Sequence, residues 1–154
     1  MPDLDKIVDR LARLEAAEAA RGLLSAYARQ CDTRDPEAVS QLFAPDGVLE
    51  VPGRHFGGRH EVRAFYSGAF TDDPTDKTHF ITNSAMVWLG GGRTAVHSYF
   101  LYTAAGDETS ILGWGEYHDV VEVGDEGARF ERKAISIRRA VDVREGWSLA
   151  VGGK

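Results

Sequence analysis

The sequence predicts a single α+β domain in which N-terminal helices pack against a cone-shaped, curved antiparallel sheet. Apolar residues recur at helical spacing over residues 4–31, with charged residues between them. The second half of the chain instead reads as long strands separated by short glycine-containing turns. These strands are expected at 78–89, 94–103, 110–123 and 128–143. Long strands joined by short turns pair antiparallel, and a strongly twisted sheet of this kind curls over its helices.

The first helical segment is expected to form one long helix, or two helices joined near Gly22. Asp35 and Pro36 then offer a capping side chain and a proline at the first helical position, which predicts a short helix that runs to about Phe43. Residues 44–47, with the sequence Ala-Pro-Asp-Gly, are expected to end this helix in a turn.

Shorter elements are expected between these helices and the long strands. Residues 48–51 read as a short strand, 52–58 as a loop rich in glycine, and 61–67 as a third helix. Gly113 and Gly115 stand two positions apart in the third long strand and therefore share a face. Small residues at these positions would help the strand to curl and leave room for a ligand.

Length and composition favour one ordinary globular domain over residues 1–154. The chain has 43% apolar and 27% charged residues, close to usual globular values. Its net charge is −6, with no run of Lys or Arg, which argues against a nucleic-acid partner. No apolar stretch approaches the ~20 residues of a membrane span, and the first residues do not resemble a secretion signal. We therefore expect no membrane partner and a cytoplasmic location.

Cysteine and histidine patterns indicate neither a metal site nor a cofactor. Cys31 is the single cysteine, so an intrachain disulfide and a thiolate metal site are excluded. We interpret it as a small buried residue rather than a reactive thiol. His55, His60 and His118 lack metal-ligand spacing and are interpreted as solvated. No glycine-rich phosphate loop or nucleophile elbow is present in the sequence.

Asp32 is placed unusually for a charged residue, just past the predicted end of the first helix. The helix dipole is negative there, so a carboxylate is electrostatically disfavoured. Asp35 already serves as the cap of the next helix. The alternatives for Asp32 are a solvated turn residue, an ion pair with Arg34, or a functional carboxylate.

His79 opens the first long strand, where alternation places it on the same face as Ile81 and Asn83. A histidine can take a proton from carbon near neutral pH if a carboxylate fixes its tautomer through the other ring nitrogen. Asp32 is a candidate for that carboxylate, although a strand histidine alone is more often structural or exposed.

Two further interpretations remain open from the pattern alone. Tyr27 lies one helical turn before Cys31, so its phenol is either a proton donor in the pocket or part of the core. In the second long strand, one face carries His97, Tyr99 and Leu101. The other face carries Val96, Ser98, Phe100 and Tyr102. Alternation does not decide which face points inward.

Four segments resemble the SnoaL-like branch of the nuclear transport factor superfamily. They are 24–32 (LSAYARQCD), 35–47 (DPEAVSQLFAPDG), 78–83 (THFITN) and 98–100 (SYF). The likeness extends over about residues 7–141. It implies a cone-shaped α+β barrel with a ligand cavity between sheet and helices, and a homodimer formed through the open sheet face.

The resemblance also implies roles for individual residues. Dehydratases and dehydrochlorinases of this branch pair an aspartate after the first helix with a strand histidine, which corresponds to Asp32 and His79, with Tyr27 as a third catalytic residue. It turns His97 outward, toward the dimer face. By the same matching, Ser98, Phe100, Tyr102, Gly113 and Tyr117 are expected to line the pocket, with Lys133 near its edge. The expected substrate-binding residues also include Leu49 and Asn83, the latter from strand alternation.

The resulting functional expectation is a cofactor-independent lyase of the dehydratase type, or an isomerase or cyclase. Its substrate would be an apolar cyclic or polyketide-like small molecule, from which the His–Asp pair abstracts a proton. Two alternatives stay open. One is a non-catalytic module that binds a small molecule, and the other is a structural subunit resembling the small chain of ring-hydroxylating dioxygenases.

Overall fold

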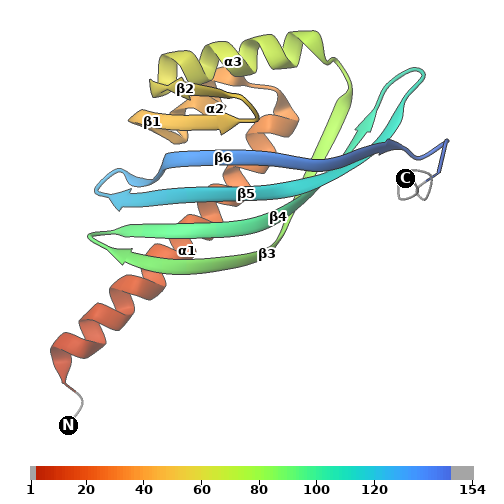
Figure 1. The fold of residues 1–154 in the computed structure, drawn as a ribbon. Helices are drawn as coiled ribbons and strands as arrows, with labels where there is room; N and C mark the ends of the chain where they lie inside the picture. The colour runs from red at the N-terminus through yellow and green to blue at the C-terminus, as the bar shows by residue number, and fades with distance from the viewer. Residues whose placement is uncertain (1–2, 147–154) are drawn as a thin grey trace.

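The computed structural model describes residues 3–146, which form three helices and six strands. In chain order these are α1 (Leu4–Thr33), α2 (Pro36–Gln41), β1 (Phe43–Val51), β2 (Arg54–Gly57), α3 (Gly58–Asp72), β3 (Asp76–Gly90), β4 (Arg93–Ala105), β5 (Ser110–Gly124) and β6 (Gly127–Asp142). Figure 1 shows α1 running across one face of the sheet, with α3 lying over the β1 and β2 end.

Helix α1 is one continuous helix. Its N-terminus is capped by the Asp3 side chain, which accepts the N–H of Asp5 at 3.2 Å. Gly22 lies within the helix and does not interrupt it. The helix ends at Arg34, which adopts the left-handed conformation (φ 59°) and donates its N–H to the carbonyl of Cys31. The helix therefore runs beyond Cys31, and Asp32 lies in its last turn rather than after its end.

The N-terminal half of α1 projects beyond the sheet (Figure 1). Its apolar residues are exposed up to Leu14, and burial begins at Ala16. From there the helix packs against the inner face of the sheet through Leu23, Leu24 and Tyr27. This second half carries Asp32 to the sheet.

All six strands form one open sheet in the order β2-β1-β6-β5-β4-β3. The four long strands pair antiparallel with their sequence neighbours, as predicted. Strand β1 pairs with β6 in parallel, so the sheet is mostly antiparallel, with one parallel pair outside the pairings between the predicted long strands. No tight turn links β1 to β6, so hairpin geometry does not impose their relative direction.

The short elements between α2 and β3 differ from expectation. The predicted turn at 44–47 lies inside β1, where the pairing with β6 shifts register. The predicted loop contains β2, which folds back on β1 through Gly53 at φ 75°. Helix α3 is longer than the predicted 61–67, because Val62, Tyr66 and Phe70 continue its inward face.

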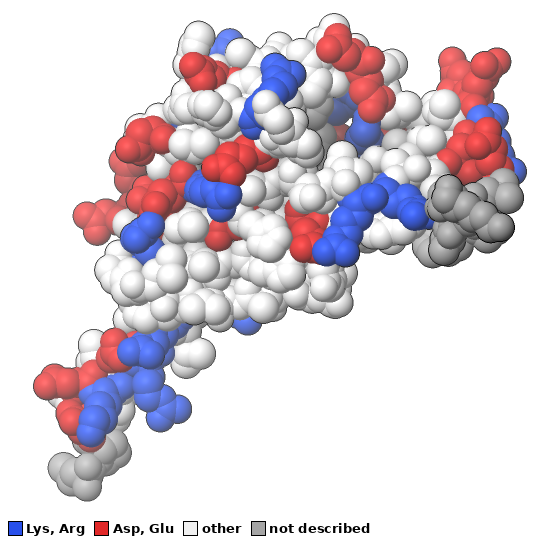
Figure 2. Space-filling model, in the orientation of Figure 1, with Lys and Arg blue, Asp and Glu red and all other residues white. Residues whose placement is uncertain are grey.

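The hydrophobic core fills the space between the inner sheet face and the helices. Its fully buried members include Val39, Phe43, Leu49, Val62, Val121 and Phe130. No helix in residues 3–146 is both long and apolar enough to cross a bilayer. In Figure 2, Lys and Arg alternate with Asp and Glu over the projecting half of α1, and the sheet face opposite α1 carries charged groups of both signs above an uncharged lower strip.

Candidate active site

A cavity of about 500 Å³ opens between α1, α3 and the inner face of the sheet. This volume falls within the range of small-molecule sites. Its wall is mostly aromatic and aliphatic, with contributions from Phe65, Phe70, Phe100, Ile135 and Ile137. A few polar side chains enter it, among them Tyr27, Tyr66, Lys77 and His79. The arrangement suits an apolar molecule held by a small number of polar groups.

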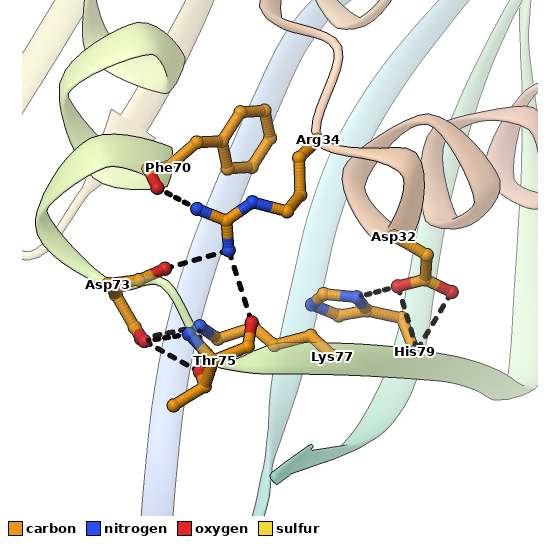
Figure 3. Close-up of polar contacts among 7 residues, drawn as sticks. All are labelled: Asp32, Arg34, Phe70, Asp73, Thr75, Lys77 and His79. Carbon is orange, nitrogen blue, oxygen red and sulfur yellow. Dashed lines mark hydrogen bonds and ion pairs between the residues drawn. The ribbon is translucent and has the colours of Figure 1, made fainter. Parts of the chain in front are cut away.

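His79 and Asp32 are in direct contact at this cavity. Nδ1 of the His79 ring lies 2.6 Å from Oδ1 of Asp32. The same carboxylate accepts the backbone N–H of His79, at 3.1 Å and 3.2 Å to its two oxygens. The second ring nitrogen, Nε2, points away from Asp32 (Figure 3). The predicted contact between the two residues is therefore present.

The two residues have different access to the cavity. His79 is part of the cavity wall, whereas Asp32 lies behind it and borders a smaller depression with Ser25, Arg29 and Ile81. Their side chains are 16% and 25% exposed. Asp32 is thus placed to orient the imidazole, and His79 is placed to meet a bound molecule.

Arg34 does not pair with Asp32, which was one alternative explanation for the carboxylate. Its guanidinium instead donates to the carbonyls of Phe70, Asp73 and Thr75, at 2.9 Å and 3.1 Å for the last two (Figure 3). These bonds tie the end of α1 to the end of α3. They hold two walls of the cavity in a fixed relation.

Tyr27 and Tyr66 form a phenol pair in the cavity wall. Their hydroxyls lie 2.7 Å apart, and both side chains are buried. Burial raises the pKa of both phenols well above the usual value, so both carry their protons at neutral pH. The pair can donate one hydrogen bond outward while sharing the other internally.

Tyr66 was not singled out from the sequence, although it lies within the predicted helix at 61–67, because that helix ended before Phe70 and its inward face was not recognised. The helix in fact continues to Asp72, and Val62, Tyr66 and Phe70 recur every four residues on its inward face. That spacing was the available signal. It would have placed Tyr66 toward the core with the other aromatic residues.

The open question about the second long strand is settled by the cavity wall. Phe100 and Tyr102 line it, together with Tyr117 of β5. Phe100 and Tyr117 stack with ring centroids 4.3 Å apart, and Tyr102 lies 5.8 Å from the His79 ring. His97, on the opposite parity, faces outward as the resemblance implied.

The lack of a side chain at Gly113 and Gly115 leaves room for these aromatic rings rather than for a ligand. Tyr102 pairs across strands with Gly113, and Phe100 pairs with Gly115. A Cβ at either glycine would clash with the ring of its partner. The expectation that Gly113 lines the pocket is therefore corrected, because the Tyr102 ring lies over it.

Four other expected pocket residues are placed elsewhere. Leu49 and Ser98 are fully buried in the core and are not part of the cavity wall. Asn83 is exposed, because the pairing of β3 with β4 shifts register between Thr82 and Ala85 and breaks the alternation from His79. Lys133 was expected at the pocket edge, but it is completely buried.

Lys133 forms a buried ion pair behind the cavity wall. Its Nζ lies 3.0 Å from Oδ2 of Asp119 and sits over the rings of Tyr117 and Tyr27, at 3.6 Å and 4.1 Å from their centroids. Burial lowers the pKa of Lys133 and raises that of Asp119, and their mutual attraction opposes both shifts. This pair therefore packs against the aromatic rings of the cavity wall, on the side away from the cavity.

Cys31 fits its interpretation as a buried residue. It is 6% exposed, and burial raises the pKa of its thiol to about 12. A thiol with such a pKa is protonated at neutral pH and is a poor nucleophile. Within residues 3–146, the group of side chains spaced to hold a metal ion lies outside this cavity, on the outer sheet face.

The sequence matches one protein-family model. Residues 12–134 match the model described as the SnoaL-like domain. No curated protein matches the sequence. The matched segment contains α2, α3, β3 to β5 and most of the cavity wall.

Several solved structures share this fold. One is a proposed scytalone dehydratase from Novosphingobium aromaticivorans DSM 12444, 20% identical, with TM-score 0.76 over 85% of this chain and 89% of that chain. Another is hexachlorocyclohexane dehydrochlorinase LinA-type3 from Novosphingobium barchaimii LL02, 18% identical, with TM-score 0.77 over 86% of this chain and 93% of that chain. A third is an NTF2-like protein with a cystatin-like fold from Novosphingobium aromaticivorans, 23% identical, with TM-score 0.72 over 90% of this chain and 92% of that chain. At these identities the likeness establishes the α+β fold.

Proposed function

The chain belongs to the SnoaL-like domain family, and on this premise we propose that it is a cofactor-independent lyase of the dehydratase type, or an isomerase or cyclase. The observation that carries the proposal is the 2.6 Å contact between His79 and Asp32, with His79 in the wall of an apolar cavity. A histidine oriented by a carboxylate and shielded from bulk water is suited to removing a proton from carbon.

In the proposed step, Nε2 of His79 takes a proton from a carbon atom of the bound molecule. Asp32 accepts the Nδ1–H bond and stabilises the imidazolium that forms, as its 2.6 Å contact allows. The electron pair of the broken C–H bond forms a new C=C bond or an enolate. This first event is common to elimination, isomerisation and aldol-type cyclisation.

In an elimination, the leaving group departs with its own bonding pair. Where the leaving group is a hydroxyl, the imidazolium of His79 returns its proton to it and water is released, so protons balance over the cycle. Tyr27 and Tyr66 present neutral phenols, which can donate a hydrogen bond to a leaving oxygen or a carbonyl.

The cavity favours an apolar cyclic or polyketide-like substrate. Flat aromatic side chains such as Phe100 and Phe70 form much of its wall, which suits a ring of similar size. The Lys77 ammonium also borders it but is paired with Asp73 and with Thr75, at 2.8 Å from the Thr75 hydroxyl. The substrate is therefore expected to carry little net charge.

The first experiment looks for proton removal itself rather than for one reaction. The protein is incubated in D₂O with a panel of apolar cyclic ketones and hydroxyketones, and deuterium entering the carbon next to the carbonyl is followed by mass spectrometry. Wild-type protein should catalyse exchange with at least one compound. His79→Gln should lower the exchange rate by ~10²–10⁴, the usual contribution of a positioned base.

His55→Gln is the matched control, because His55 is exposed on β2 and outside the cavity wall. It should exchange at the wild-type rate. If a compound binds tightly but exchanges no faster than in buffer, with affinity unaffected by His79→Gln, the non-catalytic binding module is the correct alternative. Co-purification with a larger iron-containing chain would favour the structural-subunit alternative.

The proposal includes a homodimer through the outer face of the sheet. This face carries exposed apolar side chains, including Phe80, Val87 and Tyr99. Sedimentation analysis should give twice the chain mass, and Tyr99→Lys should shift the equilibrium toward monomer. A wild-type monomer would remove the dimer while leaving the proposed chemistry untouched.

A further inference from the structure

His97, Glu116 and His118 come together on the outer face of the sheet, opposite the cavity. His97 and His118 are directly paired across strands β4 and β5. Glu116 precedes His118 by two residues, so both project from the same face of β5. Phe100 and Tyr117, which line the cavity, have the opposite parity in these strands. The cluster is thus held by the backbone ladder of two long, central strands.

The donor atoms of this cluster lie close together. Nε2 of His97 and Nε2 of His118 lie 3.1 Å and 3.3 Å from the same carboxylate oxygen, Oε2 of Glu116. One ligand atom from each of the three residues falls within 4.8 Å of the others. The two imidazole rings stack nearly parallel, with centroids 4.4 Å apart and an interplanar angle of 10°.

We propose that His97, Glu116 and His118 form a binding site for a divalent transition-metal ion such as Zn²⁺. A tetrahedral ion with bonds of ~2.0–2.2 Å holds neighbouring ligand atoms ~3.3–3.6 Å apart. The two measured nitrogen-to-oxygen separations are close to this spacing. Because the two rings stack nearly parallel, the imidazoles would have to rotate so that both Nε2 lone pairs face the same ion.

Glu116 can bind an ion without giving up its ion pair with Arg138. Arg138 contacts Oε1 of Glu116, whereas both histidines lie against Oε2. The carboxylate therefore has one oxygen free of the arginine for the metal. Arg138 would then orient the ligand through its other oxygen, as hydrogen-bonding partners commonly do around metal sites.

The ligand set and exposure define the kind of site. Two imidazoles and one carboxylate match the borderline preference of Zn²⁺, Co²⁺ and Ni²⁺ better than that of Mg²⁺ or Ca²⁺, which prefer oxygen ligands. The His97 and His118 side chains are 41% and 54% exposed. The fourth coordination position therefore faces away from the chain, where water or a side chain of a second copy can occupy it.

The test is a titration of chelator-treated protein that carries no polyhistidine tag. Zn²⁺ binding is measured by calorimetry, and Co²⁺ binding by its visible absorption spectrum. We expect saturable binding of one ion per chain and a Co²⁺ spectrum typical of nitrogen and oxygen ligands. Loss of even an indirect partner of a zinc ligand weakens binding ~10–100-fold, so His118→Ala should weaken it by at least ~100-fold.

His118 is suited to this test because its exposed ring can be removed without opening the core. Glu116→Gln should give a similar loss, and circular dichroism would show that both variants keep the fold. His60→Ala, which removes an exposed histidine of α3, is the matched control and should bind as wild type does. Absence of saturable binding, or equal binding by His118→Ala and wild type, would overturn the proposal.

Discussion

Asp32 and His79 are joined twice, once through the side chain and once through the backbone. The carboxylate lies 2.6 Å from the ring Nδ1 and also accepts the backbone N–H of His79 at 3.1 Å. Because one group receives both donors, the position of β3 relative to the last turn of α1 and the direction of the imidazole are set together. Nε2 is left pointing away from Asp32 (Figure 3).

Asp32→Asn should therefore impair the chemistry while preserving the fold. An amide at this position can donate to Nδ1 and stabilise the wrong histidine tautomer. We expect the rate of deuterium exchange to fall by ~10²–10⁴ with little change in ligand affinity. Asp107→Asn, in an exposed turn, serves as the control. An unchanged exchange rate in Asp32→Asn would assign Asp32 a structural role.

Substitutions at Lys133 and Asp119 should have strongly non-additive effects on the free energy of unfolding. Lys133→Met leaves the Asp119 carboxylate buried without its partner and should cost ~3–5 kcal/mol in the free energy of unfolding. The double variant Lys133→Met with Asp119→Leu should recover most of that loss. Urea unfolding of the two single variants and the double variant measures the coupling. If the double variant loses as much free energy of unfolding as the two single variants together, the two residues are not coupled.

Gly113 should not tolerate even a methyl group. A Cβ there would meet the Tyr102 ring, so Gly113→Ala should cost ~1–3 kcal/mol and displace Tyr102 toward the cavity. Gly22 has open space around its α-carbon and lies in an exposed part of α1. Gly22→Ala should instead stabilise the protein by ~1 kcal/mol. Thermal unfolding compares the two variants, and equal effects would refute the packing argument.

Asp73 should contribute stability that is lost in acid. Burial opposes its ionisation, but hydrogen bonds from Lys77 and Thr75 outweigh burial and lower the pKa of this carboxyl to about 2. A carboxyl whose pKa falls on folding stabilises the protein fully above its ordinary pKa of 3.8, and this contribution disappears as pH falls through the folded value.

Asp73→Asn should therefore be less stable than wild type at pH 7, and the difference should shrink as the pH falls from 3.8 to about 2. The loss at pH 7 should stay below ~1 kcal/mol, because the Asp73 side chain is 51% exposed. Thermal midpoints of both proteins, measured from pH 7 to pH 2, provide the comparison. A difference that is constant with pH would show that ionisation of Asp73 is not involved.

Local patterns in the sequence were sufficient for the helices and the long strands. Helical spacing predicted α1, the Asp35–Pro36 pair predicted the start of α2, and alternation predicted β3 to β6. The parallel pairing of β1 with β6 could not be predicted in this way, because it depends on contacts between residues far apart in the sequence.

The sequence pattern located some residues of the site and misplaced others, for the same reason. Asp32 stood out because a carboxylate is disfavoured at a helix C-terminus, and the family resemblance linked it to His79. Asn83 was misplaced because a register shift in β3 reverses the face of every residue beyond it. The convergence of His97 and His118 depends on the register between β4 and β5, which spacing along the chain does not reveal.

The most direct test of the proposed mechanism is the position of the proton on the neutral His79 ring. Long-range ¹⁵N–¹H correlation NMR can determine it without a substrate, with the signals assigned by comparison with His79→Gln. The account predicts a proton on Nδ1, bonded to Asp32, and a bare Nε2 that can accept a proton from carbon. A proton on Nε2 in the wild-type protein would contradict it, because the nitrogen directed away from Asp32 would then be unable to act as the base.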